Sequence, residues 1–237
     1  QTETFRLVGY ARLTKDAPVL RIYIEGDGHN WSNRFQPSDD PTPWSPIALR
    51  LATTDKSASV AWIARPCQYV APGSDPECQV HYWTEGRYAE QVVVAENAAI
   101  SRLTKIAGAR SVELVGYSGG GPVALLVAAR RNDVDSVRTV AANVDTDFWI
   151  KQGGMNPLTG SLNPANQADR LAKLPQLHVV GDRDQIVARD VVDAYRQRFR
   201  DPACVGIVVE QGMTHGGDWA FFWPALLQRQ IPCHHAK

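Results

Sequence analysis

After Gly108 the sequence alternates between segments typical of β-strands and segments typical of α-helices. Short runs rich in β-branched residues predict strands at Val112–Val115, Val137–Ala142, Gln176–Val180 and Val205–Val209. Apolar or amphipathic runs predict helices at Pro122–Arg130, Arg189–Phe199 and Trp219–Gln228. Strands that alternate with helices in this way form a parallel sheet covered on both faces. The sequence therefore predicts an α/β fold.

The first half of the chain is less regular. Phe5–Leu13 and Val19–Ile24 are separated by a turn-like segment ending in Pro18, which predicts an antiparallel pair. Pro46 can open a short helix, Ile47–Ala52, and Ser59–Ala64 is predicted to be a strand.

A long amphipathic helix is predicted over Glu90–Ala107, because apolar residues recur there every three to four positions. Glu96, Arg102 and Lys105 are expected on its other faces, and Gly108 as its C-terminal cap.

The length of 237 residues suits one sizeable core, so a single domain over residues 1–237 is expected. Residues 145–170 contain Gly153-Gly154 and two Asn-Pro dipeptides, which predicts a small loop-rich cap excursion between two strands.

Charge and hydropathy exclude several classes of protein. Lys plus Arg and Asp plus Glu number 25 each, so no net field favours nucleic acid or an anionic membrane surface. No apolar run approaches the ~20 residues that cross a bilayer. We expect no nucleic-acid partner and no membrane span.

The four cysteines lie in two pairs along the chain and form no zinc-type pattern. Two disulfides, Cys67–Cys78 and Cys204–Cys233, are therefore predicted, the second because the last helix returns the chain to the level of Cys204. The alternative is four buried thiols in a cytosolic enzyme. Disulfides and the start at Gln1 favour a secreted or periplasmic protein whose targeting segment has been removed.

Gly116-Tyr117-Ser118-Gly119-Gly120 is a G-x-S-x-G motif between a predicted strand and a predicted helix. A nucleophilic serine on such a tight turn leaves no room for neighbouring side chains, which explains the glycines. The helix that follows places its N-terminal dipole beneath developing negative charge. A turn that only packs a helix on a sheet would also be glycine-rich.

A serine hydroxyl needs a base, and six histidines are candidates. His215 lies between the last strand and the last helix, at the sheet edge where α/β proteins place their sites. His178 lies within a strand and is predicted to be a satisfied core residue. The others lie in early loops or at the C-terminus: His29, His81, His234 and His235. We predict His215 as the general base.

The acid that orients the histidine should come from another such loop. Asp184 follows the strand Gln176–Val180 and is the preferred candidate. Asp182 is closer to the strand and could instead brace the loop, and Asp145 after the preceding strand is a third option.

The order Ser118, Asp184, His215 and the setting of the serine resemble the α/β-hydrolase superfamily. Further segments resemble a group of bacterial α/β-hydrolase-domain proteins: Ile24-Glu25-Gly26-Asp27-Gly28, Arg65-Pro66-Cys67-Gln68-Tyr69, Trp83-Thr84 and the motif itself. The resemblance implies an α/β-hydrolase fold, with an oxyanion hole formed by the backbone N–H groups of Gly119 and Asp27.

Glu25 stands where this superfamily usually has histidine, so carboxylates lie near the expected oxyanion. Like charge there is costly unless it is paired, and Arg34, Arg65 or Arg87 could pair with it. The alternative is that Glu25 turns away and accepts backbone hydrogen bonds.

Aromatic residues near the site loops, Trp31, Tyr117, Trp149 and Trp219, are candidates for lining a substrate pocket, although ordinary core packing would also explain each of them. We expect a serine hydrolase that cleaves small acyl esters or thioesters. An amidase or peptidase would use the same residues. A binding protein that has the fold but no catalytic activity is the alternative outside the enzymes. No metal or organic cofactor is expected, because no ligand spacing or phosphate-loop lysine is present.

Overall fold

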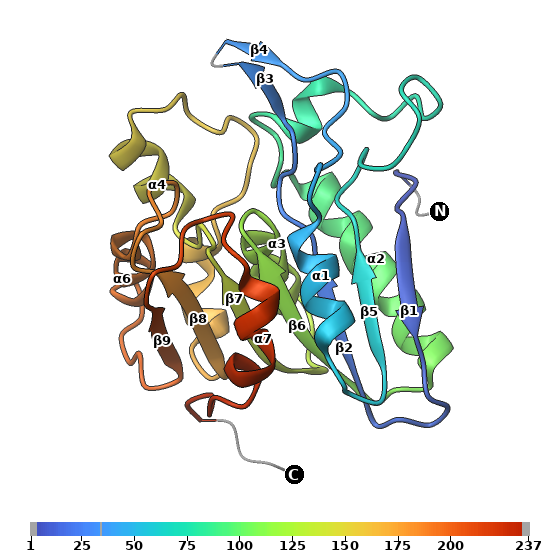
Figure 1. Cartoon of the computed structure of the whole chain (residues 1–237), viewed down its shortest axis with the longest axis vertical. Coiled ribbons are helices and arrows are strands. Elements are labelled where there is room, and N and C mark those ends of the chain that lie inside the picture. The colour runs from blue at the N-terminus through green and yellow to red at the C-terminus, as the bar shows by residue number, and fades with distance from the viewer. Residues whose placement is uncertain (1–3, 34, 234–237) are drawn as a thin grey trace.

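The computed structural model describes residues 4–33 and 35–233 of the chain. Its larger sheet has the strand order β1-β5-β2-β6-β7-β8-β9 (Figure 1). Its strands are β1 (Gly9–Arg12), β2 (Val19–Ile24), β5 (Val60–Ile63), β6 (Ser111–Tyr117), β7 (Val134–Val140), β8 (Gln176–Gly181) and β9 (Val205–Glu210). Except for β1, neighbouring strands are parallel, as predicted. A separate small hairpin consists of β3 (Trp31–Asn33) and β4 (Gln36–Pro37).

The α-helices are α1 (Ile47–Thr54), α2 (Glu90–Ala107), α3 (Gly120–Ala128), α4 (Thr146–Gly153), α5 (Ala168–Leu171), α6 (Arg189–Arg196) and α7 (Trp219–Leu227). Two short 3₁₀ segments are η1 (Val80–Trp83) and η2 (Pro164–Gln167). The predicted cap excursion is thus partly helical, because it contains α4, η2 and the start of α5. The αL conformation of Gly108 ends α2, as predicted.

The sheet is covered on both faces because residues along its strands alternate between two cores. Ile22 and Ile24 belong to the cluster that contains residues of α2 and α3, whereas Tyr23 between them belongs to the cluster of α1 and α7. In Figure 1, α1 and α7 lie in front of the sheet and α2 behind it. This arrangement leaves the carboxyl ends of the parallel strands open at one edge.

The predicted antiparallel pairing of the first two strands is wrong. β1 pairs antiparallel with β5, and β2 lies between β5 and β6, parallel to both. All four residues of β1 are exposed, whereas β2 is largely buried. A buried strand needs a partner on each side, so β2 takes the centre and β1 the edge.

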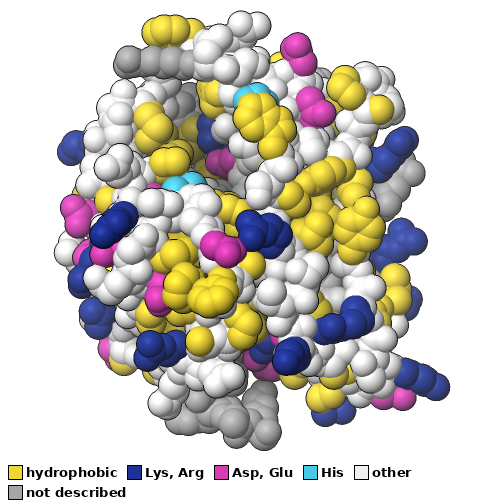
Figure 2. All heavy atoms as spheres, viewed as in Figure 1, with side chains coloured by type: hydrophobic (Ala, Val, Ile, Leu, Met, Phe, Trp, Pro, Cys, Tyr) yellow, Lys and Arg dark blue, Asp and Glu magenta, His cyan; other side chains and the backbone are white. Residues whose placement is uncertain are grey.

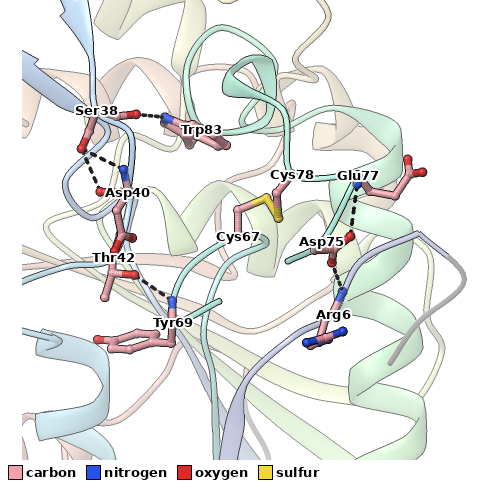
Figure 3. Close-up of a disulfide and its surroundings, with 10 residues drawn as sticks. All are labelled: Arg6, Ser38, Asp40, Thr42, Cys67, Tyr69, Asp75, Glu77, Cys78 and Trp83. Atoms are coloured by element: carbon pink, nitrogen blue, oxygen red, sulfur yellow. Dashed lines mark hydrogen bonds between the residues drawn. A yellow bond between two sulfur atoms is a disulfide. The ribbon is translucent and has the colours of Figure 1, made fainter. Parts of the chain in front are cut away.

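Both predicted disulfides are present, Cys67–Cys78 and Cys204–Cys233. The first lies in the irregular segment after β5 and is drawn in Figure 3 with its surroundings. The second ties the end of the described chain to the start of β9.

Candidate active site

Ser118 lies in the turn between β6 and α3, with a left-handed φ of 48°. Such a φ is strained for a residue with a side chain and persists only where the surroundings impose it. A Cβ atom on Gly116 would lie 2.4 Å from the Gly120 carbonyl oxygen, and one on Gly120 would lie 2.2 Å from the Ile24 carbonyl oxygen. The turn therefore requires both glycines.

Three side chains from the ends of three parallel strands form a hydrogen-bonded chain. Ser118 Oγ lies 3.0 Å from His215 Nε2, and His215 Nδ1 lies 2.9 Å from Asp184 Oδ2. Asp184 is buried, and its other oxygen accepts from the backbone N–H groups of Ile186 and Val187 at 2.9 and 2.8 Å. This arrangement can take the hydroxyl proton onto Nε2 while the carboxylate holds the Nδ1–H tautomer.

The other acid candidates have structural contacts. Asp182 accepts from the Gly212 N–H at 2.6 Å and so braces the loop, as its alternative interpretation predicted. Asp145 caps α4, accepts from the Phe148 N–H and forms an ion pair with Arg198 at 3.0 Å. Neither of these carboxylates has a hydrogen bond to His215 among the described residues.

The remaining described histidines lie elsewhere. His178 is buried against Thr139 at 2.8 Å, and burial lowers its pKa to about 3. Its Nε2 has no hydrogen-bond partner in the described part of the chain, so it is a core residue but not a fully satisfied one. His29 stacks on Trp44, and His81 pairs with Glu85. His234 and His235 lie outside the described residues.

The loop after β2 packs directly against the serine turn. A Cβ atom on Gly26 would lie 3.3 Å from Ser118 Cβ, and one on Gly119 would collide with the Asp27 carboxylate. The loop at residues 26–27 thus packs against the turn at residues 118–119, and the resemblance implied that these two segments form an oxyanion hole.

The Asp27 carboxylate is paired rather than free. It accepts from Arg65 at 3.2 Å, from Arg87 at 3.0 Å and from the Tyr88 hydroxyl at 3.1 Å. Burial alone would raise the pKa of Asp27, but Arg87 and Arg65 hold it below its ordinary value. Arg65 also donates to the Gly119 carbonyl at 3.0 Å, so the network ties the loop to the serine turn. Tyr88 carried no pattern in the sequence that could have revealed this role.

Glu25 turns away from the serine. Its carboxylate accepts from the backbone N–H groups of Gly26, Ala48 and Leu49 and from the Trp62 indole at 2.9 to 3.2 Å. Burial raises its pKa, and these four donors oppose that shift. Glu25 therefore fastens the loop to the N-terminus of α1, in agreement with the interpretation that it turns away and accepts backbone hydrogen bonds.

Ser118 and His215 lie in a cleft of about 1300 Å³. Of the predicted pocket residues, Trp31, Tyr117 and Trp149 line it, together with Phe35 and Trp44. Figure 2 shows this face of the molecule hollowed, with hydrophobic side chains around the opening and charged and histidine side chains within.

The sequence model of the serine hydrolase family FSH1 matches residues 39–215, a range that includes Ser118, Asp184 and His215. The chain belongs to this serine hydrolase family. No match was found among curated proteins.

Solved structures of α/β serine hydrolases confirm the α/β-hydrolase fold of the FSH1-family chain. A serine hydrolase homologue from Coxiella burnetii is 18% identical with a TM-score of 0.60, covering 96% of this chain and 93% of its own. Est1E from Butyrivibrio proteoclasticus, solved with ferulic acid, is 15% identical with a TM-score of 0.65, covering 95% and 94%. XC6422 from Xanthomonas campestris, a serine hydrolase without a lid, is 16% identical with a TM-score of 0.58, covering 95% and 90%.

In this serine hydrolase, Trp219 does not line the cleft, contrary to prediction. It is fully buried, and its indole donates to the His215 carbonyl at 2.8 Å. The Tyr117 hydroxyl donates to the same carbonyl at 3.1 Å. Two rings from different elements thus hold the backbone of the histidine.

The described part of the serine hydrolase contains no group of three or more His, Cys, Asp or Glu residues that could hold a metal ion. Within the same part, no helix combines the length and apolar character that crossing a membrane requires.

Proposed function

We propose that this serine hydrolase cleaves carboxylic esters or thioesters through an acyl-enzyme intermediate on Ser118. The observation that carries the proposal is the hydrogen-bonded chain Ser118–His215–Asp184, with distances of 3.0 and 2.9 Å. A catalytically silent binding protein would have no need for this arrangement.

Each step uses groups of this chain. As Ser118 Oγ attacks the acyl carbon, its proton passes to His215 Nε2, while Asp184 stabilises the imidazolium. The N–H groups of Gly119 and Asp27 donate to the oxyanion. His215 then protonates the leaving alcohol or thiol, and water, activated by the same nitrogen, releases the acid and frees the serine.

Two findings favour particular features of this proposal. Est1E, which shares the fold, was solved with ferulic acid, a carboxylic acid of the kind that cleavage of an ester or thioester would release. The two disulfides favour action in an oxidising compartment, outside the cell or in a periplasm.

Labelling with a fluorophosphonate probe tests the nucleophile. The wild-type protein should carry one adduct on Ser118, and Ser118→Ala none.

Asp184→Asn should lower kcat for an ester by up to about 10⁴-fold, because its amide favours the wrong tautomer of His215. Asp182→Asn is the matched control in the same loop, since its amide oxygen can still accept from the Gly212 N–H. Labelling of Ser118→Ala, or equal losses in the two aspartate variants, would reject the mechanism.

A further inference from the structure

Large apolar side chains remain exposed around the mouth of the cleft. Phe35 is 84% exposed, Trp44 87% and Ile186 58%, and all three line the cleft. Leaving such apolar surface in contact with water is unfavourable. A concentration of exposed apolar surface at a cleft marks a binding site rather than ordinary surface.

On one wall of the cleft, contacts within the protein hold the Trp44 ring and the backbone of the β3–β4 hairpin in place. Trp44 stacks on His29 with ring centres 4.3 Å apart, and the His29 N–H donates to the Pro41 carbonyl. The β3–β4 hairpin, which carries Trp31 and Phe35, is closed by the Asn33 side chain, which accepts from the N–H groups of Phe35 and Gln36.

The segment closed by the Cys67–Cys78 disulfide and η1, which follows it, both contact the loop that leads to Trp44. The Tyr69 N–H donates to the Thr42 hydroxyl at 2.7 Å, and the Trp83 indole donates to the Ser38 carbonyl at 3.0 Å (Figure 3). The loop that leads to Trp44 is therefore fastened to a cross-linked part of the chain.

The other side of the cleft is formed by the cap segment and the loop after Asp184. Trp149 on α4 donates from its indole to the Ile186 carbonyl at 2.7 Å, which joins these two segments. Met155 and Ile186 add exposed aliphatic surface there.

The acidic and basic side chains that line the cleft each have hydrogen-bond partners within the protein. Asp27 pairs with Arg87, Glu25 accepts four hydrogen bonds, and Glu85 accepts from Thr84 and His81. Among the described residues, the charged side chains in the lining are three carboxylates and one arginine, so the lining does not favour an anionic ligand. Asn30, Asn33 and Asn156, which also line the cleft, can hydrogen-bond to hydroxyl or ether substituents.

From these observations we infer that the mouth of the cleft is a subsite for an uncharged aryl ring of the substrate. The inference rests on the proposed ester or thioester cleavage. A planar ring can stack on the exposed faces of Trp31, Phe35 and Trp44, whereas a saturated ring of similar size cannot.

The test compares matched pairs of neutral esters that differ only in the ring. Ethyl 3-phenylpropanoate and ethyl 3-cyclohexylpropanoate probe the acyl side, and benzyl and cyclohexylmethyl acetate probe the alcohol side. In one of the pairs, kcat/KM should favour the aryl ester by up to about tenfold. A ratio near one in both pairs would overturn the subsite.

Variants of the aromatic residues at the mouth of the cleft test where the preference for aryl esters arises. Trp44→Ala and Phe35→Ala should bring the aryl-to-cyclohexyl ratio close to one, while Trp44→Phe keeps most of it. Phe221→Ala is the control, because Phe221 is 74% exposed on α7 and does not line the cleft. An unchanged ratio in both alanine variants would place the preference elsewhere and reject the assignment.

Binding of the same esters to Ser118→Ala, followed by tryptophan fluorescence, separates this inference from the proposed chemistry. If wild-type protein is not labelled by fluorophosphonate but Ser118→Ala binds the aryl ester more tightly, only the proposed chemistry fails. If labelling and hydrolysis occur and neither turnover nor binding favours the aryl ring, only the subsite fails.

Discussion

Glu96 lies in the middle of α2 and is fully buried, although the helical pattern placed it on a polar face. Neither of its oxygens has a hydrogen-bond partner among the described residues, and the nearest opposite charge is Arg65 Nε at 3.9 Å. Burial raises the pKa of Glu96 to about 8, and Arg65 only partly opposes that shift. The prediction was wrong because α2 packs with this turn toward Arg65, which helical periodicity alone does not reveal.

Replacing Glu96 should change how stability depends on pH. Between about pH 4.5 and 8, the unfolded chain loses the Glu96 proton and the folded chain keeps it, so stability falls as pH rises through this window. Glu96→Gln removes this titration. Between pH 5 and pH 8 the decrease in unfolding free energy should therefore be about 1–3 kcal/mol smaller in the variant than in the wild-type protein. Urea unfolding at the two pH values measures this. Parallel pH dependence of the two proteins would refute the buried, protonated state.

At the scale of elements, the site depends on β6 and α7 meeting at one peptide group. Tyr117 at the end of β6 and Trp219 at the start of α7 both donate to the His215 carbonyl. These bonds fix the loop that carries the histidine, at a distance from the reacting atoms. They are positioning contacts, and their loss should misplace the imidazole without removing it.

Tyr117→Phe keeps the ring and removes one of the two donors. We expect kcat for a small ester to fall about three- to tenfold with little change in KM, as for a lost hydrogen bond of about 0.5–1.5 kcal/mol. Tyr195→Phe is the control, because its hydroxyl is buried against Gln176 away from the cleft and should affect stability only. Steady-state kinetics decide the point, and equal effects of the two variants on kcat would contradict the positioning role.

For the whole molecule, the two disulfides close loops of different length. Cys204 and Cys233 are separated by 29 positions and Cys67 and Cys78 by 11. The longer loop restricts the unfolded chain more. The shorter one encloses a segment that contacts the loop leading to Trp44.

Double serine variants should separate these contributions. Cys204→Ser with Cys233→Ser should lower the unfolding free energy by about 2–4 kcal/mol, and Cys67→Ser with Cys78→Ser by about 1 kcal/mol less. Only the second variant should also weaken discrimination between aryl and cyclohexyl esters. Denaturant unfolding and the ester pairs measure both effects. A larger stability loss in the second variant would argue against the loop-length explanation.

Local rules were enough to predict much of this protein. The G-x-S-x-G turn, the cap at Gly108 and the parallel order after β6 depend on glycine geometry and on periodicity, which act between near neighbours in the chain. Asp184 and His215 could be selected because parallel strands bring their carboxyl ends to one edge, so position after a strand indicates position in the site.

Long-range packing decided the rest. The partner of β1, the burial of Glu96 and the turning of Trp219 away from the cleft depend on which surfaces meet between elements far apart in sequence. The same holds for Asp27, whose buried carboxylate beside the serine turn is paired only because Arg65 and Arg87 converge on it. A residue's type and spacing specify what it can bond to, but only the folded chain brings the partners within bonding distance.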